Sequence, residues 1–226
     1  MLKPALMLML TLAACGGEES QAPEAPAKAK AKAKAAAPAA YVAKQEPLVG
    51  GPYPTLLLSQ AWFLTVDGKP KPGPARLEIW RQGPAGWVTT KLEDPDSNVF
   101  HKAIMEKDGS ILTIGAMGAH LKRWKFADGK WNQDTLWTES WGGKFDRLRD
   151  IEIGDVDGDG KDEYVIATHD FGVIAVYNPG ENGGKPEIIQ MDKKKDTFVH
   201  EIEIGDIDGD GKLEFFATPS DRNKAS

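Results

Sequence analysis

The sequence predicts an all-β fold built from repeated four-stranded units, and three observations lead to this prediction. The 226 residues include 24 Gly and 15 Pro, which punctuate turns and therefore favour many short strands over a few long helices. From residue 57 onward, similar segments recur 44 to 53 residues apart. Apolar and polar residues alternate inside these segments, whereas no sustained helical period occurs between residues 48 and 226.

Three kinds of segment recur in a fixed order. The first is an apolar strand that ends in an aromatic residue, the second follows it after a polar turn, and the third precedes each new unit. They lie at 77–80, 121–124 and 173–177, at 87–93, 131–137 and 186–191, and at 100–104, 148–153 and 199–204. About four short strands in each repeat of roughly 50 residues predict the blades of a β-propeller. A β-solenoid is the main alternative, although its repeats are usually shorter.

The last repeat reaches residue 226 without its final two strands, so the sequence supplies about three and a half blades. A closed propeller needs roughly four to eight blades. We therefore expect the chain to be a fragment of a longer protein, because an open strand edge would otherwise invite aggregation. Closure of the sheet by a second chain is the alternative.

Two nine-residue loops carry the clearest chemistry. They read DVDGDGKDE at 155–163 and DIDGDGKLE at 206–214. Aspartates at positions 1, 3 and 5 direct three carboxylates at one centre, and glycine at position 6 permits the sharp turn. A main-chain carbonyl at position 7 and a carboxylate at position 9 complete an oxygen cage of the kind that Ca²⁺ prefers. The predicted ligands are Asp155, Asp157, Asp159, Lys161 and Glu163 in the first loop and Asp206, Asp208, Asp210, Lys212 and Glu214 in the second, both lysines contributing only their carbonyls.

An EF-hand is the competing interpretation of these loops, and the sequence disfavours it. An EF-hand loop needs a bidentate Glu at position 12. That position holds Ile166 in one copy and Ala217 in the other, and the flanking segments are typical of strands rather than helices. Acidic hairpin turns without metal are the other alternative. The equivalent hairpin at 105–110 (MEKDGS) lacks the aspartate ladder, so we expect a turn without metal there.

The patterns IEIGDVDGDGKDEYVIAT and IEIGDIDGDGKLEFFAT resemble the FG-GAP or VCBS repeats of integrin α-subunit propellers and of many bacterial surface proteins. The similarity is strong over residues 148–226 and weaker upstream. This resemblance implies that each loop joins the first two strands of a blade and binds Ca²⁺ through the ligands named above, which gives two calcium sites.

Residues 1–14 are typical of a secretory signal peptide, since Lys3 precedes an apolar run that is shorter than the roughly 20 residues needed to cross a membrane. Leu12-Ala13-Ala14-Cys15 resembles the bacterial lipobox, which implies that Cys15 is lipidated and becomes the mature N-terminus. The protein would then be anchored in the membrane of the bacterial cell envelope, and Gly16 favours the outer membrane. A plain signal peptide with an incidental cysteine is the alternative.

Residues 15–47 consist largely of Ala, Pro, Lys, Glu and Gly, so we expect a disordered linker between Cys15 and the repeats at 48–226. The repeat segment carries 22 basic and 30 acidic residues, a net charge of −8. This negative charge repels phosphate backbones and disfavours nucleic acid as a partner.

Four residues form a possible ligand patch: His101, Arg147, Arg149 and His200. His101, Arg149 and His200 occupy similar repeat positions, which in a propeller would gather near the central channel. Isolated surface positions are the alternative. We find no phosphate-binding glycine loop and no nucleophile elbow. The sequence therefore favours a non-enzymatic binding or scaffold module with a protein or polysaccharide ligand. The alternatives are a propeller-type polysaccharide-acting enzyme, either a lyase or a hydrolase, and a carbohydrate-binding protein.

Overall fold

The computed structural model describes residues 55–83, 85–192, 194 and 197–220, which all belong to one unit, Lys44–Ser226. The predicted signal peptide at 1–14, Cys15 and the linker at 15–47 lie outside the described residues.

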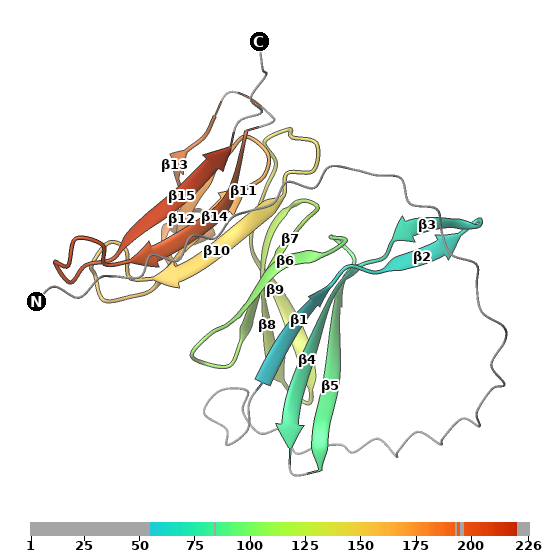
Figure 1. The fold of residues 1–226 in the computed structure, drawn as a ribbon. Coiled ribbons are helices and arrows are strands. Elements are labelled where there is room, and N and C mark those ends of the chain that lie inside the picture. Colours follow the sequence, from blue (N-terminus) through green and yellow to red (C-terminus); the bar gives the residue numbers. More distant parts are fainter. Residues whose placement is uncertain (1–54, 84, 193, 195–196, 221–226) are drawn as a thin grey trace, which may run out of the picture. The chain divides into compact units, whose positions relative to one another are not determined.

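The strands of the described residues form five antiparallel sheets (Figure 1). One four-stranded sheet contains β6 (Phe100–Met105), β7 (Ile111–Gly115), β8 (Ala119–Ala127) and β9 (Lys130–Glu139). The other contains β10 (Leu148–Gly154), β11 (Glu163–Thr168), β12 (Ile174–Tyr177) and β13 (Glu187–Gln190). Both follow the chain order from one edge to the other, as the predicted repeat requires.

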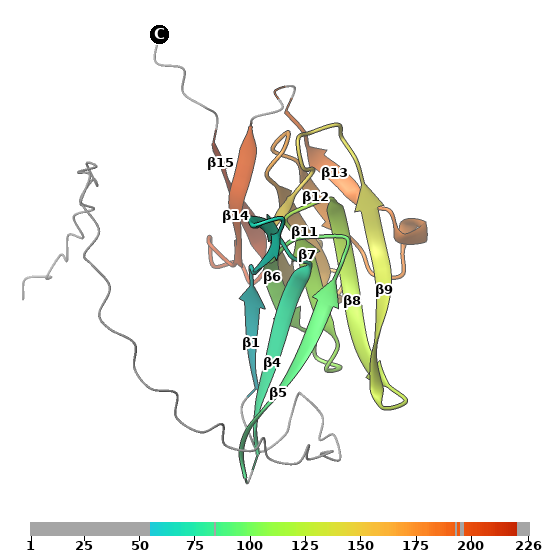
Figure 2. The same cartoon turned by 90° about the vertical axis from the view of Figure 1, so that its right-hand side faces the viewer.

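The remaining three sheets have fewer strands. A three-stranded sheet has the order β1 (Thr55–Gln60), β4 (Ala75–Gly83) and β5 (Gly86–Asp94), as Figure 2 shows. The strands β14 (Phe198–Gly205) and β15 (Glu214–Ser220) form a pair, and so do β2 (Phe63–Val66) and β3 (Lys69–Pro72). The hairpin β2–β3 is an insertion that the sequence analysis did not predict.

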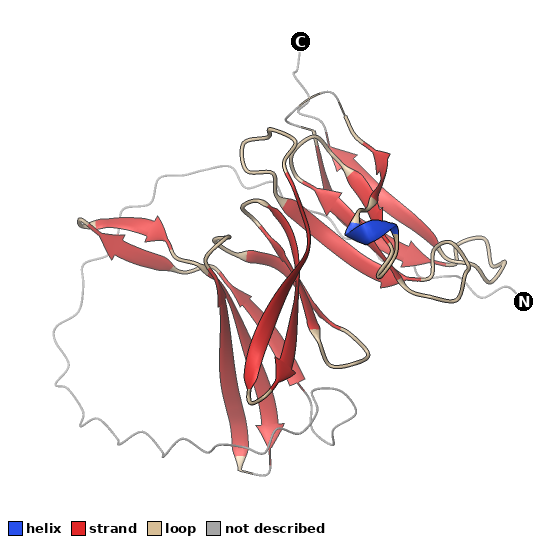
Figure 3. Ribbon diagram, turned by 180° about the vertical axis from the view of Figure 1, so that it is seen from behind, coloured by secondary structure: helices blue, strands red, loops and turns tan. Residues whose placement is uncertain are grey.

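The predicted all-β class is confirmed. Among the described residues the only helical segment is a single 3₁₀ turn at Asn182–Gly184, drawn in blue in Figure 3. No helix in this part of the chain is long and apolar enough to span a membrane. The described residues do not contain a closed propeller, so closure remains a prediction.

Turn chemistry fixes two of the hairpins. Asp67 and Gly68 join β2 to β3, and Asp128 and Gly129 join β8 to β9. All four residues have positive φ, between 53° and 77°. Two consecutive residues with positive φ define the tight turn whose twist matches that of the flanking strands, and Asp-Gly is a preferred pair for it.

Each sheet packs on the next through its own hydrophobic cluster. One cluster lies between the sheet of β1, β4 and β5 and the sheet of β6–β9, a second between β6–β9 and β10–β13, and a third between β10–β13 and β14–β15. The strand β11 serves two clusters, because Tyr164 and Ile166 face the second while Val165 and Ala167 face the third. All residues of β7 and β11 are buried, as expected for strands covered on both faces.

Polar contacts join the first strands of successive sheets. The ammonium of Lys102 on β6 lies 2.9 Å from Oδ1 of Asp150 on β10. The other oxygen of Asp150, Oδ2, accepts a hydrogen bond of 2.7 Å from the main-chain N–H of Ile202 on β14. One buried carboxylate thus links β6, β10 and β14 side by side.

The same three strands share an irregularity near their starts. The pairing of β6 with β7 skips His101, and the pairing of β10 with β11 skips Arg149. In β14 the register shifts between Val199 and Ile202, a stretch that includes His200. A bulge of this kind leaves its residue out of the ladder and changes the direction in which the side chain points.

The two-sided burial of β11 predicts a large cost for removing side-chain volume there. Ile166→Ala should lower the free energy of unfolding by about 2 to 5 kcal/mol, because it deletes buried methyl groups and leaves a cavity. Chemical denaturation measures this change. Ile188→Ala, on the exposed strand β13, is the matched control and should change stability by no more than about 0.5 kcal/mol. Equal effects of the two substitutions would contradict the packing described.

Candidate functional site

The two acidic loops join equivalent strands. Residues 155–163 connect β10 to β11, and residues 206–214 connect β14 to β15. Strands therefore flank both loops, whereas an EF-hand would place helices there. The prediction against an EF-hand is confirmed.

The first loop is folded around its own carboxylates. Oδ1 of Asp155 accepts a hydrogen bond of 2.8 Å from the N–H of Gly158, and its Oδ2 accepts one of 3.0 Å from Gly160. Oδ1 of Asp157 accepts from the N–H of Asp159 at 3.0 Å. Because Gly158 and Gly160 have φ near 80° and 89°, the chain can reverse twice within the loop.

The second loop repeats this network with the same geometry. Asp206 accepts from the N–H groups of Gly209 and Gly211 at 2.8 and 3.0 Å, and Asp208 accepts from Asp210 at 3.0 Å. The glycines again have positive φ, 78° and 87°. Glycine at position 4 of each loop is therefore as necessary as the predicted glycine at position 6. The sequence analysis missed it, although the GDG spacing recurs in both copies.

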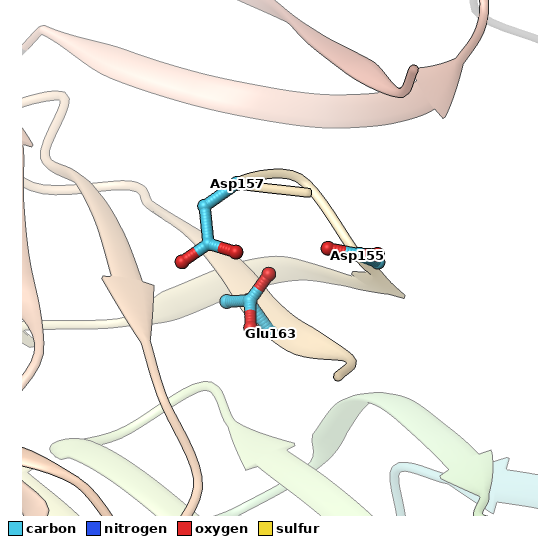
Figure 4. A group of neighbouring side chains, drawn as sticks. All are labelled: Asp155, Asp157 and Glu163. Carbon is cyan, nitrogen blue, oxygen red and sulfur yellow. The ribbon is translucent and has the colours of Figure 1, made fainter. Parts of the chain in front are cut away.

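The carboxylates converge in both loops. One oxygen from each of Asp155, Asp157 and Glu163 lies within 4.8 Å of the others, and Figure 4 shows the two loop side chains meeting Glu163 from the following strand. In the second loop, one oxygen from each of Asp206, Asp208 and Asp210 lies within 4.8 Å of the others. Asp159 and Glu214, both predicted ligands, are not members of these groups, and the predicted carbonyls of Lys161 and Lys212 remain predictions.

The oxygen spacing fits a calcium ion. Two oxygens bound to one Ca²⁺ lie at most about 5 Å apart, since each Ca–O distance is about 2.3 to 2.6 Å. In each group the three carboxylate oxygens lie within 4.8 Å of one another, so one Ca²⁺ could contact all three. The ligands are all oxygen, which suits a hard cation rather than zinc.

Both predicted ligands outside the groups take part in polar contacts. The ammonium of Lys161 lies 3.0 Å from Oδ2 of Asp159 and 2.9 Å from Oε1 of Glu181. The hydrogen bond from Lys161 lowers the pKa of Asp159. In the second loop Oε2 of Glu214 accepts from the N–H of Ile207 at 3.0 Å, as Glu163 does from Val156.

Glu163 is the buried member of the first group, with 2% of its surface exposed. Burial raises the pKa of its carboxyl, and the negative charges of Asp157 and Asp159 raise it further. A carboxylate in this environment lacks a compensating positive charge, which a bound cation would supply.

The hairpin at 105–110 uses its acidic residues differently. Oε2 of Glu106 lies 2.7 Å from Nε of Arg123, and Glu106 also accepts a hydrogen bond from the hydroxyl of Tyr164 on the next sheet. Asp108 accepts from the N–H of Ser110 at 2.9 Å. The guanidinium of Arg123 therefore places a positive charge beside Glu106.

The structure brings the four residues of the possible ligand patch close together. Nη1 of Arg149 donates to Nε2 of His101 at 3.3 Å. Nη2 of Arg147 donates to Nδ1 of His169 at 3.1 Å, and the ring of His169 lies 5.7 Å from that of His200. We call His101, Arg147, Arg149, His169 and His200 the His/Arg cluster. Sequence analysis passed over His169 because it lies in a turn region and belongs to no motif.

The three histidines of the His/Arg cluster share one electrostatic field. Burial is the largest cause that lowers the pKa of His101, His169 and His200. The positive charges of Arg147 and Arg149 lower the pKa of all three further. His101 also contacts the carbonyl of Leu148 through Nδ1 at 2.7 Å, so its two contacts fit the neutral ring with Nδ1 protonated.

Comparison with known proteins agrees with the loop geometry. A family model described as an FG-GAP-like repeat matches residues 155–217, a segment that includes both acidic loops and β11 to β14. Comparison with curated proteins finds no similar sequence.

Because the pKa of Glu163 is raised, neutralising this side chain should change the melting temperature in opposite directions with and without calcium. In metal-free protein, the folded state holds this proton more tightly than the unfolded state, whose pKa is about 4.3. That stabilisation is lost as the pH rises through the raised pKa. At pH 7 in EDTA, Glu163→Gln should therefore raise the melting temperature by about 2 to 4 °C, the shift expected for about 1 kcal/mol. In calcium the same substitution should lower it.

Glu187→Gln, on the exposed strand β13, is the matched control and should leave both melting temperatures unchanged. Destabilisation by Glu163→Gln in EDTA as well as in calcium would mean that the side chain acts through its hydrogen bond to Val156 and not as a ligand.

Proposed function

We propose that this protein is a calcium-stabilised β-propeller module that acts in binding or scaffolding on the bacterial cell envelope. The observation that carries the proposal is the pair of loops at 155–163 and 206–214. Both gather three carboxylates within 4.8 Å on the same hydrogen-bonded framework. Their match to an FG-GAP-like repeat supports the blade assignment.

The position of the loops supports a structural role for the metal. Each loop joins the first two strands of a sheet, so an ion there would tie those strands together. Carboxylates and a carbonyl would occupy most of the six to eight positions that Ca²⁺ takes, which leaves little room for a substrate. We therefore propose a binding or scaffold role without catalysis. Shortening of a polysaccharide incubated with the purified full-length protein would contradict it and would favour a lyase or hydrolase.

The membrane anchor is part of the proposal and rests on sequence. Leu12-Ala13-Ala14-Cys15 would place a lipid on Cys15, and residues 16–47 would separate the module from the outer membrane. Mass spectrometry of the protein purified from bacterial membranes tests this. A diacylglycerol-modified Cys15 at the N-terminus would support it, whereas an unmodified cysteine within an intact or differently cleaved chain would contradict it.

Calcium should raise the melting temperature of the whole protein, because the ion binds the folded loops and not the unfolded chain. At a free concentration 100 times the dissociation constant, each site contributes about 2.7 kcal/mol, which corresponds to about 5 to 10 °C. Differential scanning calorimetry with calcium and then excess EDTA measures the shift. Magnesium at the same concentration is the control and should shift it less, because Mg²⁺ demands a smaller octahedral cage. An unchanged melting temperature after chelation would defeat the metal assignment.

The two sites should be separable by single substitutions. Asp157→Ala and Asp208→Ala should each reduce the calcium stoichiometry, measured by isothermal titration calorimetry, from two to about one. Asp134→Ala, which removes an exposed carboxylate from β9, is the control and should retain both sites. A stoichiometry of two in both loop variants would show that the ligands are assigned wrongly.

A further inference from the structure

The His/Arg cluster has a common structural origin in the first strands of three successive sheets. His101, Arg149 and His200 all lie at the register shifts of β6, β10 and β14. These strands are neighbours, since Asp150 contacts both Lys102 and the main chain of Ile202. The bulges therefore present one histidine or arginine from each sheet at adjacent positions.

The two arginines are incompletely neutralised. Among the described residues Arg149 has no carboxylate within ion-pair distance, and its one polar contact there is His101. Nε of Arg147 is buried without a hydrogen-bond partner in the described part of the chain, and the nearest carboxylate oxygen, of Asp170, lies 4.0 Å away. That oxygen already accepts from the main-chain N–H of Arg147 at 3.3 Å. A buried polar nitrogen left in this state costs free energy.

Aromatic surface adjoins these charges. The guanidinium carbon of Arg147 lies 4.7 Å from the ring centroid of Phe145, and the ammonium of Lys144 lies 4.8 Å from the same ring. Phe145 is 36% exposed and lines a cleft of about 550 Å³. The charged residues Lys144, Glu139 and Asp146 also line this cleft, together with Met117, Thr138 and Ser140. The ring of Phe198 lies against both His169 and His200, with ring centroids 4.9 and 4.4 Å apart.

We propose that the His/Arg cluster binds the carboxylate of a short acidic sugar, and that the exposed ring of Phe145 takes the apolar face of a sugar ring in the adjoining cleft. Guanidinium groups hold carboxylates through paired N–H donors, and the neutral imidazoles of His169 and His200 add further donors. The net charge of −8 over residues 48–226 opposes a long polyanion, so a ligand with few charges, such as a chain end, fits better. This inference rests on the proposed role as a binding module and names the chemistry of its ligand.

Anion binding at this place should also take up protons. A carboxylate beside the arginines would offset the positive charge that lowers the pKa of the three histidines. The other charged groups that act on them are Asp170 near His169 and Glu201 near His200, and each raises the pKa of its neighbouring histidine. The bound carboxylate would likewise raise the pKa of the histidines, which would then take up protons.

Isothermal titration calorimetry of the full-length protein in calcium buffer tests the proposal with three probes. Trigalacturonate should bind, more weakly as salt is raised, whereas the neutral galactose trimer should bind at least about tenfold more weakly. Equal affinity for the neutral trimer, or no binding of trigalacturonate, would overturn the proposal. Binding of tri-aspartate in preference to trigalacturonate would assign the cluster to acidic peptides and would overturn the sugar assignment.

Two substitutions locate the site. Arg149→Gln should weaken trigalacturonate binding about tenfold or more, since it removes a charged donor. Arg76→Gln, which removes a positive charge from β4 in another sheet, is the matched control and should leave the affinity unchanged. Unaltered affinity in Arg149→Gln would overturn the proposal. If Arg149→Gln does not fold, His200→Gln at an exposed position replaces it and should also weaken binding.

The calcium-induced melting shift of the same variants separates this inference from the proposed function. A retained shift with lost sugar binding supports the site. A normal shift in wild-type protein that binds no trigalacturonate would overturn the sugar site and leave the calcium-stabilised module intact.

Discussion

Burial of β7 and β11 on both faces is the constraint on which the rest of the structure depends. Because the side chains of a strand alternate, each of these strands contributes to two hydrophobic clusters, one shared with the sheet before it and one with the sheet after it. No sheet in the interior of this series can form its core alone. Asp150 also links neighbouring sheets, since its carboxylate contacts Lys102 on β6 and the main chain of Ile202 on β14.

This packing explains where acidic side chains are tolerated. The first loop joins the partly buried strand β10 to the fully buried strand β11, and the second joins β14 to β15, so most of the carboxylates remain near water while the strands fix their spacing. Glu163 is the exception, because it begins β11 and is already buried. In the hairpin at 105–110, Glu106 forms an ion pair with Arg123.

The sequence predicts those features that are local and repeated. The strand class, the four-stranded unit and the loops between first and second strands follow from period-two alternation and from nine-residue motifs that occur twice. The hairpin β2–β3 escapes prediction because it interrupts one repeat only, although its Asp-Gly turn is a recognisable signal. His169 escapes for another reason. Its partners Arg147 and His200 are 22 and 31 residues away, and only the pairing of β10 with β11 and the packing of β14 against their sheet bring them together.

The shared bulge at His101, Arg149 and His200 has a consequence for how such repeats diversify. A residue omitted from the ladder can change without altering strand register, and its side chain does not belong to the hydrophobic clusters between sheets. Each repeat therefore offers one position that is free to drift in sequence beside positions that are held fixed by packing. Duplication of the unit would multiply such positions, so that new recognition surfaces could evolve while the scaffold is inherited unchanged.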